Sequence, residues 1–136
     1  VLPSFAVFDF IYVGAFAIEM FDTATGLVAN EMAPRVHNSG HWTIEGAATS
    51  QFENHMRAVC RLPLGDCTPV GYSAMFNLIG VHPDTRRVLA VPDVHLHLYG
   101  KSERPGRKLG HVTVRSRTRE DLLRHVESLR AIPPFI

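Results

Sequence analysis

The sequence predicts an α+β fold, because strand-like and helix-like segments alternate along a chain of 136 residues. Segments 48–59 and 118–130 carry apolar residues at helical spacing, whereas 72–80 and 94–99 are short apolar runs typical of strands. The chain shows no internal repeat and no low-complexity tract. A chain of this length buries roughly two-thirds of the surface that its unfolded form exposes, so we expect a hydrophobic core.

Composition and charge place the chain among soluble globular proteins. Hydrophobic residues make up 46% and charged residues 20% of the sequence, which argues against both disorder and a membrane protein. With 14 Lys and Arg residues against 13 Asp and Glu residues, the chain has no strong field of either sign. We therefore expect neither nucleic acid nor a membrane as a partner.

The first 18 residues are apolar but lack the features of a targeting segment. They contain Pro3 and Asp9 and have neither a basic leader nor a small-residue cleavage site, so we predict no signal peptide and no membrane span. Because the chain starts without methionine in strand-like sequence, we expect further residues before Val1. Two cysteines, Cys60 and Cys67, are too few for a disulfide framework, and a cytoplasmic location is expected.

A β-hairpin is predicted near the start of the chain. The apolar segments 12–21 and 27–32 are separated by turn residues at 22–26. Glu19 and Glu31 lie near the ends of the two strands, and cross-strand pairing brings such positions together. Carboxylates of this kind suit Mg²⁺ that is bound together with phosphate oxygens. Two solvent-facing glutamates are the alternative, and from hairpin spacing alone they are the commoner case.

Segment 33–42 is predicted to be a loop dense in hydrogen-bond donors. It has few apolar residues to pack, which favours a functional role over simple connection. Its Arg35 side chain is suited to binding a phosphate or carboxylate through two parallel hydrogen bonds. A turn whose polar groups satisfy its own backbone is the alternative. His37 and His41 are four residues apart, but they lack a third ligand at a spacing that would define a zinc site.

The remaining segments complete the α+β pattern. A helix is expected over 48–59 and strands over 72–80, 94–99 and 111–114. The last segment, 118–130, is an expected amphipathic helix with Thr118 as its N-cap. On the strand at 94–99, His95 and His97 share one face, where core or interface histidines are commoner than ligands.

A charged connection joins the strands expected at 94–99 and 111–114. Segment 101–108 holds four cations around a Pro-Gly turn, and this arrangement is chemically suited to a phosphate monoester. A solvated charged hairpin is the alternative. Nucleic acid would usually require a broader basic face with aromatic side chains for stacking.

These features in this order resemble the carboxyl-terminal part of the N5-carboxyaminoimidazole ribonucleotide synthetases, which are ATP-grasp ligases. The resemblance covers residues 12–114, most of the chain, and the run 30–51 is long enough to make a chance match negligible. The matching stretches are YVGAFAIEMF, NEMAPRVHNSGHWTIEGAATSQFENHMRAV, LPLGD, FNLIG and HLHLYGKSERPGRKLGHVTV.

The resemblance implies the carboxyl-terminal part of an ATP-grasp domain in residues 1–60, followed by a small β-rich carboxyl-terminal domain with a terminal helix in 61–136. It implies a reaction in which ATP activates bicarbonate as carboxyphosphate and the amine of 5-aminoimidazole ribonucleotide captures the carboxyl group. ATP and Mg²⁺ are the implied cofactors, and a homodimer is the implied assembly of the full-length enzyme.

Site residues are carried over from the same resemblance. Glu19 and Glu31 match magnesium ligands, and Asn30 with Glu31 matches the pair that contacts ATP. Arg35 matches the arginine that stabilises charge on the transferring phosphoryl group. The residues implied on the substrate side of the site are His37, Asn38, Ser39, His41, Lys101, Arg107 and Lys108.

Family members also carry an amino-terminal doubly wound domain and a central domain that supplies lysines around the nucleotide, and this sequence contains neither. Because positioning supplies much of the rate in such reactions, we expect these residues not to catalyse the reaction alone. One alternative is a binding module that recognises a ribonucleotide phosphate through the cations of segment 101–108. Another is an inactive remnant whose apolar edge at 1–10 promotes self-association.

Overall fold

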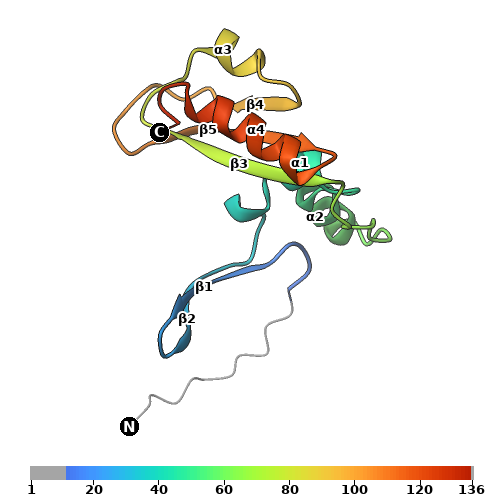
Figure 1. The fold of residues 1–136 in the computed structure, drawn as a ribbon. Coiled ribbons are helices and arrows are strands. Elements are labelled where there is room, and N and C mark those ends of the chain that lie inside the picture. The colour runs from blue at the N-terminus through green and yellow to red at the C-terminus, as the bar shows by residue number, and fades with distance from the viewer. Residues whose placement is uncertain (1–11, 136) are drawn as a thin grey trace.

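The computed structural model describes residues 12–135, which form two antiparallel sheets and several helices (Figure 1). This mixture confirms the predicted α+β class. The apolar edge expected at 1–10 lies outside the described residues. In chain order the elements are β1 (Ala17–Thr23), β2 (Gly26–Ala33), a 3₁₀ turn (Asn38–Gly40), α1 (Thr43–Gly46), α2 (Gln51–Val59), β3 (Tyr72–Ile79), α3 (Thr85–Leu89), β4 (Val94–Leu98), β5 (Lys108–Ser116) and α4 (Arg119–Arg130).

Strands β1 and β2 form the predicted hairpin, which projects away from the rest of the described chain (Figure 1). Thr23 pairs with Gly26 across the turn, and the Thr23 hydroxyl donates to the Gly26 carbonyl at 2.6 Å. Gly26 has a φ of 120°, a conformation that glycine adopts at little steric cost. Nearly all side chains of the hairpin are exposed, so backbone pairing is its main internal support.

The second sheet has the order β3-β5-β4, and all its neighbouring strands are antiparallel. Strand β5 lies in the centre and is buried along most of its length. Helix α4 packs on β3 and β5, and α3 packs beside β4. The core between these elements includes the fully buried side chains of Leu78, Val88, Leu109, Val112, Val114 and Leu129.

Most predicted elements are confirmed, with differences at their ends. The strand expected at 111–114 is longer, because a central strand paired on both sides extends from Lys108 to Ser116. The helix expected at 48–59 begins at Gln51, where the Ser50 hydroxyl accepts from the backbone N–H of Glu53. Thr118 caps α4 as expected by accepting from the backbone N–H of Asp121.

Two short helices, α1 and α3, were not predicted. They contain four and five residues, which is too short for apolar periodicity to be visible in the sequence. Helix α3 is fixed by its N-cap Asp84, whose carboxylate accepts from the backbone N–H groups of Arg86 and Arg87. None of the helices among residues 12–135 combines the length and the apolar character needed to cross a membrane.

Backbone hydrogen bonds connect residues before and after residue 60, where the domain boundary is expected. The backbone N–H of Ala48 donates to the Thr68 carbonyl at 3.0 Å, and that of Val70 donates to the Gly46 carbonyl at 2.8 Å. The segment around α1 is therefore attached to the β-rich part. The boundary itself stays a prediction.

Candidate active site

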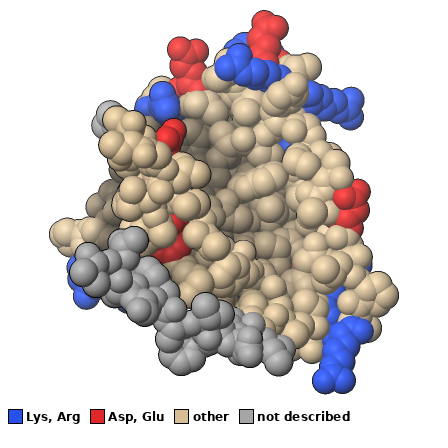
Figure 2. All heavy atoms as spheres, turned by 90° about the horizontal axis from the view of Figure 1, so that it is seen from below, with Lys and Arg blue, Asp and Glu red and all other residues tan. Residues whose placement is uncertain are grey.

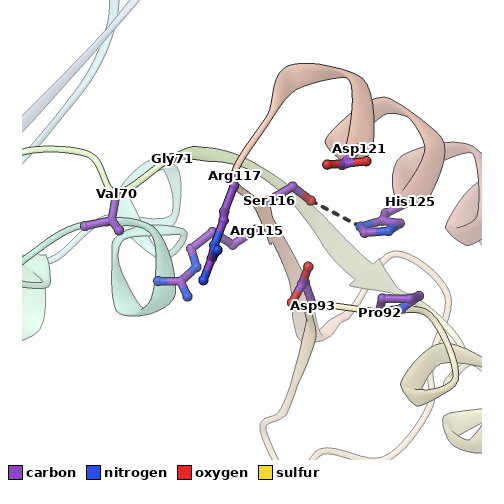
Figure 3. A pocket seen from close by; sticks show the side chains of 9 residues that line it. All are labelled: Val70, Gly71, Pro92, Asp93, Arg115, Ser116, Arg117, Asp121 and His125. Carbon is purple, nitrogen blue, oxygen red and sulfur yellow. Dashed lines mark hydrogen bonds between the residues drawn. The ribbon is translucent and has the colours of Figure 1, made fainter.

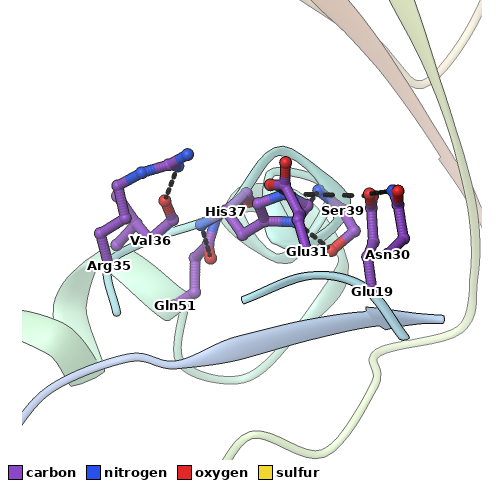
Figure 4. Close-up of polar contacts among 8 residues, drawn as sticks. All are labelled: Glu19, Asn30, Glu31, Arg35, Val36, His37, Ser39 and Gln51. Carbon is purple, nitrogen blue, oxygen red and sulfur yellow. Dashed lines mark hydrogen bonds and ion pairs between the residues drawn. The ribbon is translucent and has the colours of Figure 1, made fainter. Parts of the chain in front are cut away.

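Glu19 and Glu31 are paired directly across the hairpin. The register shifts at the next position, where Met20 pairs with Ala29, so Asn30 is an extra residue on β2. In a regular strand the side chains of adjacent residues point to opposite faces. At this bulge, however, Asn30 Nδ2 donates to Glu19 Oε2 at 3.1 Å (Figure 4). The bulge therefore brings the three predicted side chains to one place.

His37 connects the loop after β2 to these carboxylates. Its Nε2 lies 3.0 Å from Glu31 Oε1 and 3.9 Å from Glu19 Oε1. Its Nδ1 accepts from the backbone N–H of Ser39 at 3.4 Å and lies 2.8 Å from the Ser39 hydroxyl. Because Nδ1 acts as an acceptor, Nε2 carries the proton and donates to Glu31. His37 is 8% exposed, so it holds one partly exposed carboxylate from a buried position.

The arrangement of Glu19 and Glu31 suits a divalent cation. Ligand atoms of Glu19, Glu31 and His37 all lie within 4.8 Å of one another. Like charges directly opposite each other in a hairpin repel, and a cation between them would remove that cost. Carboxylate oxygens are the ligands that Mg²⁺ prefers, so the two glutamates fit Mg²⁺. The contact of His37 with Glu31 would orient that carboxylate toward a bound ion.

A pocket of about 510 Å³ opens beside these carboxylates. It brings together the exposed guanidinium of Arg35, the loop histidines and a lysine from the distant strand β5. Arg35 Nη1 donates to the Val36 carbonyl at 3.0 Å. The residues lining the pocket are Glu31, Arg35, Val36, His37, Asn38, His41, Phe52 and Lys108.

Gln51 fixes the loop that forms this pocket. Its Oε1 accepts from the His37 backbone N–H at 3.0 Å, and its Nε2 donates to the His37 carbonyl at 2.7 Å. The same nitrogen lies 2.8 Å from His41 Nδ1. Sequence reasoning missed this role, because a glutamine in the first turn of a helix carries no signal of a side-chain contact with a distant loop.

Three imidazole rings lie next to one another, and the first of them belongs to His41 in the pocket lining. The ring of His41 lies 5.3 Å from that of His111, which stacks on His97 at 4.4 Å. The Tyr99 hydroxyl lies 2.7 Å from His111 Nδ1. Burial is the main cause that lowers the pKa of His111 to about 4, and the neighbouring His97, His41 and Lys108 contribute to the same shift. His111 is therefore uncharged near neutral pH.

The pKa of His41 is also lowered. Burial is the main cause, followed by the positive charge of Lys108 and by the imidazoles of His37 and His97, whereas a hydrogen bond with the His37 backbone opposes the shift. Lys108 is thus the cation whose field reaches this part of the pocket most strongly.

The other two predicted cations lie outside the pocket lining. The Lys101 ammonium lies 5.6 Å from the centre of the Tyr99 ring, and Arg107 Nη1 donates to the Ser102 hydroxyl at 3.1 Å. Ser39 touches the site through His37, as described above. The structure therefore groups most of the predicted residues around one pocket, and among the predicted cations of segment 101–108 it places Lys108 there.

A further contact between α1 and the sheet of β3, β5 and β4 is formed by Glu45 and His97. Glu45 Oε1 lies 2.6 Å from His97 Nε2, and the Glu45 side chain is 9% exposed. Arg115 Nη1 donates to the backbone carbonyl of Glu45 at 3.2 Å. These contacts attach α1 to the sheet that carries Lys108 and His111.

A second cavity, of about 720 Å³, contains none of the predicted site residues (Figure 3). Its lining has mixed charge, with Arg115 and Arg117 together with Asp93 and Asp121. On the face shown in Figure 2, Lys and Arg side chains are likewise separated by uncharged and acidic residues, and they do not form a continuous basic patch there.

Two family models match parts of this chain. Residues 5–52 match the family model of the ATP-grasp domain. Residues 73–125 match the family model of the phosphoribosylaminoimidazole carboxylase C-terminal domain. The two matches lie on either side of the loop that follows α2.

Similar proteins include several N5-carboxyaminoimidazole ribonucleotide synthases. The N5-carboxyaminoimidazole ribonucleotide synthase of Pseudomonas aeruginosa is 56% identical over 121 residues, which are 89% of this chain and 34% of that protein. The crystal structure of the synthetase from Thermus thermophilus has a TM-score of 0.86 at 55% identity and covers 92% of this chain and 35% of its own.

The synthase of Aspergillus clavatus, in complex with ADP and 5-aminoimidazole ribonucleotide, has a TM-score of 0.73 at 40% identity. That match covers 87% of this chain and 34% of the fungal chain. The chain thus spans about one third of the length of the relatives it matches. In sequence and in fold, it belongs as a segment to the family of N5-carboxyaminoimidazole ribonucleotide synthetases.

Proposed function

We propose that this chain supplies one part of the active site of an ATP-dependent ligase that carboxylates 5-aminoimidazole ribonucleotide with bicarbonate. The observation that carries the proposal is the pairing of Glu19 and Glu31 beside a pocket lined by Arg35 and Lys108. Carboxylates for a metal nucleotide and cations for anionic substrates are the two groups that such a reaction requires.

In the proposed reaction, the γ-phosphoryl group passes from ATP to a bicarbonate oxygen, which releases ADP and forms carboxyphosphate. The amine nitrogen of the ribonucleotide then attacks the carboxyl carbon. A carbon–nitrogen bond forms, the carbon–oxygen bond to phosphate breaks, and the amine loses one proton. The products are the N5-carboxylated ribonucleotide, ADP and phosphate.

On the nucleotide side, Glu19 and Glu31 are the proposed ligands of Mg²⁺, and Asn30 with Glu31 contacts ATP. When bound, the metal neutralises charge on the phosphate oxygens. Asn30 holds Glu19 through its amide and His37 holds Glu31 through its imidazole. The hairpin therefore presents two carboxylates in fixed positions rather than as independent surface groups.

On the substrate side, Arg35 is the proposed stabiliser of negative charge on the transferring phosphoryl group or carboxyphosphate. The loop residues His37, Asn38, Ser39 and His41 surround the same pocket or support it. Lys108, which lies in that lining, is the proposed contact for the phosphate of the ribonucleotide. Lys101 and Arg107 are proposed to add positive charge from outside the lining.

The relatives support the substrate assignment. The Aspergillus clavatus synthase was solved with ADP and 5-aminoimidazole ribonucleotide, and also with ATP. By the same relationship we propose that the complete protein is a homodimer. Cys60 and Cys67 are both exposed free thiols, which supports a reducing compartment and hence the cytoplasm.

The test is an assay of the complete protein with ATP, Mg²⁺, 5-aminoimidazole ribonucleotide and ¹³C-labelled bicarbonate. We expect ADP to form only slowly without the ribonucleotide, and the label to appear in a carboxylated ribonucleotide when all components are present. Binding of the ribonucleotide without ADP formation would instead favour a binding module. That result, or ADP formation without transfer of the label, would contradict the proposed reaction.

A further inference from the structure

The side-chain amide of Gln51 has only one orientation that satisfies its surroundings. Its oxygen accepts from the His37 N–H, and its nitrogen donates to the His37 carbonyl. Turning the amide over would place N–H against N–H and oxygen against oxygen, which leaves four groups unsatisfied. The contacts with one backbone residue thus decide which end of the amide is the nitrogen.

This orientation decides the protonation of His41. One amide hydrogen of Gln51 is used by the His37 carbonyl, and the second points to His41 Nδ1 at 2.8 Å. Nδ1 must then be an acceptor, because a hydrogen on it would face the amide hydrogen. A neutral His41 therefore carries its proton on Nε2, and a cationic His41 would lose this contact.

The surroundings of His41 also disfavour its cation. Burial lowers its pKa most, and Lys108 from β5 and the imidazoles of His37 and His97 lower it further. The ring of His111 packs on the same side chain at 5.3 Å, and His111 is itself uncharged near neutral pH. Only the His37 carbonyl favours the cation, because a protonated His41 ring could donate to it in competition with the Gln51 amide.

The second ring nitrogen of His41, Nε2, is accessible from outside the protein. Nε2 has no hydrogen-bond partner among residues 12–135, and it is not one of the buried polar atoms that lack a partner there. His41 lines the pocket together with Arg35 and Lys108. An N–H group is therefore available to a ligand at a place where two cations already lie.

We propose that Gln51 is a positioning residue that holds His41 as an uncharged imidazole with its proton on Nε2, so that His41 offers a hydrogen-bond donor to an oxyanion in the pocket. The oxyanion, a carboxylate or phosphate oxygen of the bound substrates, is assigned on the basis of the proposed function. An uncharged imidazole donates a hydrogen bond without releasing its proton near neutral pH. Arg35 and Lys108 supply the positive charge, and the N–H group of His41 fixes the position of the oxyanion by a directional hydrogen bond.

The test is nuclear magnetic resonance of the complete protein with ¹⁵N-labelled histidine. The His41→Gln variant assigns the His41 signals by their loss. In the wild type we expect the Nε2–H form, with a protonation midpoint below 6.5. A wild-type His41 with its proton on Nδ1, or as a cation at pH 7, would overturn the proposal without the need for any further variant.

Two variants distinguish the effect of losing the Gln51 amide from the effect of adding a negative charge at the same position. Gln51→Glu cannot donate to Nδ1, so we expect the neutral form to move to Nδ1–H and the proton affinity of His41 to rise about tenfold or more. Gln51→Leu adds no charge, and we expect it to abolish the preference for Nε2–H. Unchanged tautomer populations in both variants would overturn the role of Gln51.

An activity readout is independent of the spectra. In the ligase assay, we expect Gln51→Glu to lose most kcat/KM at pH values above the protonation midpoint of His41, because its neutral imidazole then has no hydrogen on Nε2 to donate to the oxyanion. Tautomer signals are measured without turnover. If the ligase reaction fails but the Nε2–H form is found, the proposed function is wrong while the positioning role of Gln51 stands.

Discussion

His37 Nε2 lies 3.0 Å from Glu31 Oε1, so a buried imidazole holds a carboxylate that is itself half exposed. The contact joins two segments that the sequence presents separately, the second strand of a hairpin and the loop that follows it. It makes the position of Glu31 depend on the loop, and the loop in turn is held by Gln51.

Removing this support should weaken metal binding without removing a proposed ligand. We expect His37→Ala to raise the Mg²⁺ concentration for half-maximal ATP turnover by about 10- to 100-fold, the usual cost of losing a group that orients a metal ligand. His95→Ala, at an exposed site on β4, is the matched control. Equal Mg²⁺ dependence in the two variants would show that His37 does not position Glu31.

The two cations at the end of segment 101–108 should differ in importance. Lys108 lines the pocket, whereas Arg107 is turned to Ser102. Loss of a charged hydrogen bond costs about 1.5–3 kcal/mol, so Lys108→Ala should weaken binding of 5-aminoimidazole ribonucleotide about tenfold or more. Calorimetric titration measures the affinity. A larger loss for Arg107→Ala would reverse the assignment.

His111 should make stability depend on pH. Its pKa is about 4 in the folded protein, below the unfolded value of 6.5, so between these pH values the unfolded chain binds more protons. Stability is therefore fully present above pH 6.5 and is lost as the pH falls toward 4, by up to about 3 kcal/mol.

The His111→Gln variant keeps a polar side chain near Tyr99 but cannot titrate. Denaturant unfolding at several pH values between 7.5 and 4.5 compares it with the wild type. We expect the gap in unfolding free energy to narrow as the pH falls, because only the wild type loses this contribution. A constant gap would mean that His111 titrates alike in both states.

Glu45 and His97 should be coupled in stability. The Glu45 carboxylate is buried and His97 is its close partner, so His97→Ala would leave a buried charge unpaired, at a cost of about 2 kcal/mol. In a double-mutant cycle with Glu45→Gln, we expect a coupling energy of about 1–2 kcal/mol. Additive effects would argue that the pair does not hold α1 to the sheet.

Much of the fold follows from local patterns in the sequence. The hairpin was predicted because turn residues separate two apolar runs, and α4 because Thr118 precedes an amphipathic segment. These features depend on residues close together in the chain. The extent of β5 was underestimated, because its pairing with both β3 and β4 is a long-range property that residues 108–116 do not reveal alone.

The site was predictable in its residue types but not in its contacts. Glu19, Glu31 and Arg35 are predicted site residues on the basis of hairpin spacing, loop composition and the family resemblance. The bulge that turns Asn30 toward Glu19 was not, because a one-residue shift in register leaves no mark on the apolar pattern. The amide contact between Gln51 and His41 was missed for a similar reason, since it requires the loop and α2 to be placed together.

The most direct test of the account is ATP turnover by Glu31→Gln in the complete protein, with Glu53→Gln on an exposed part of α2 as the control. Glu31 is half exposed, so its substitution should leave the thermal midpoint close to that of the wild type. We expect Mg²⁺-dependent turnover to fall at least about 100-fold in Glu31→Gln and to stay near the wild-type rate in Glu53→Gln. A folded Glu31→Gln protein with wild-type turnover would contradict the metal site and the function built on it.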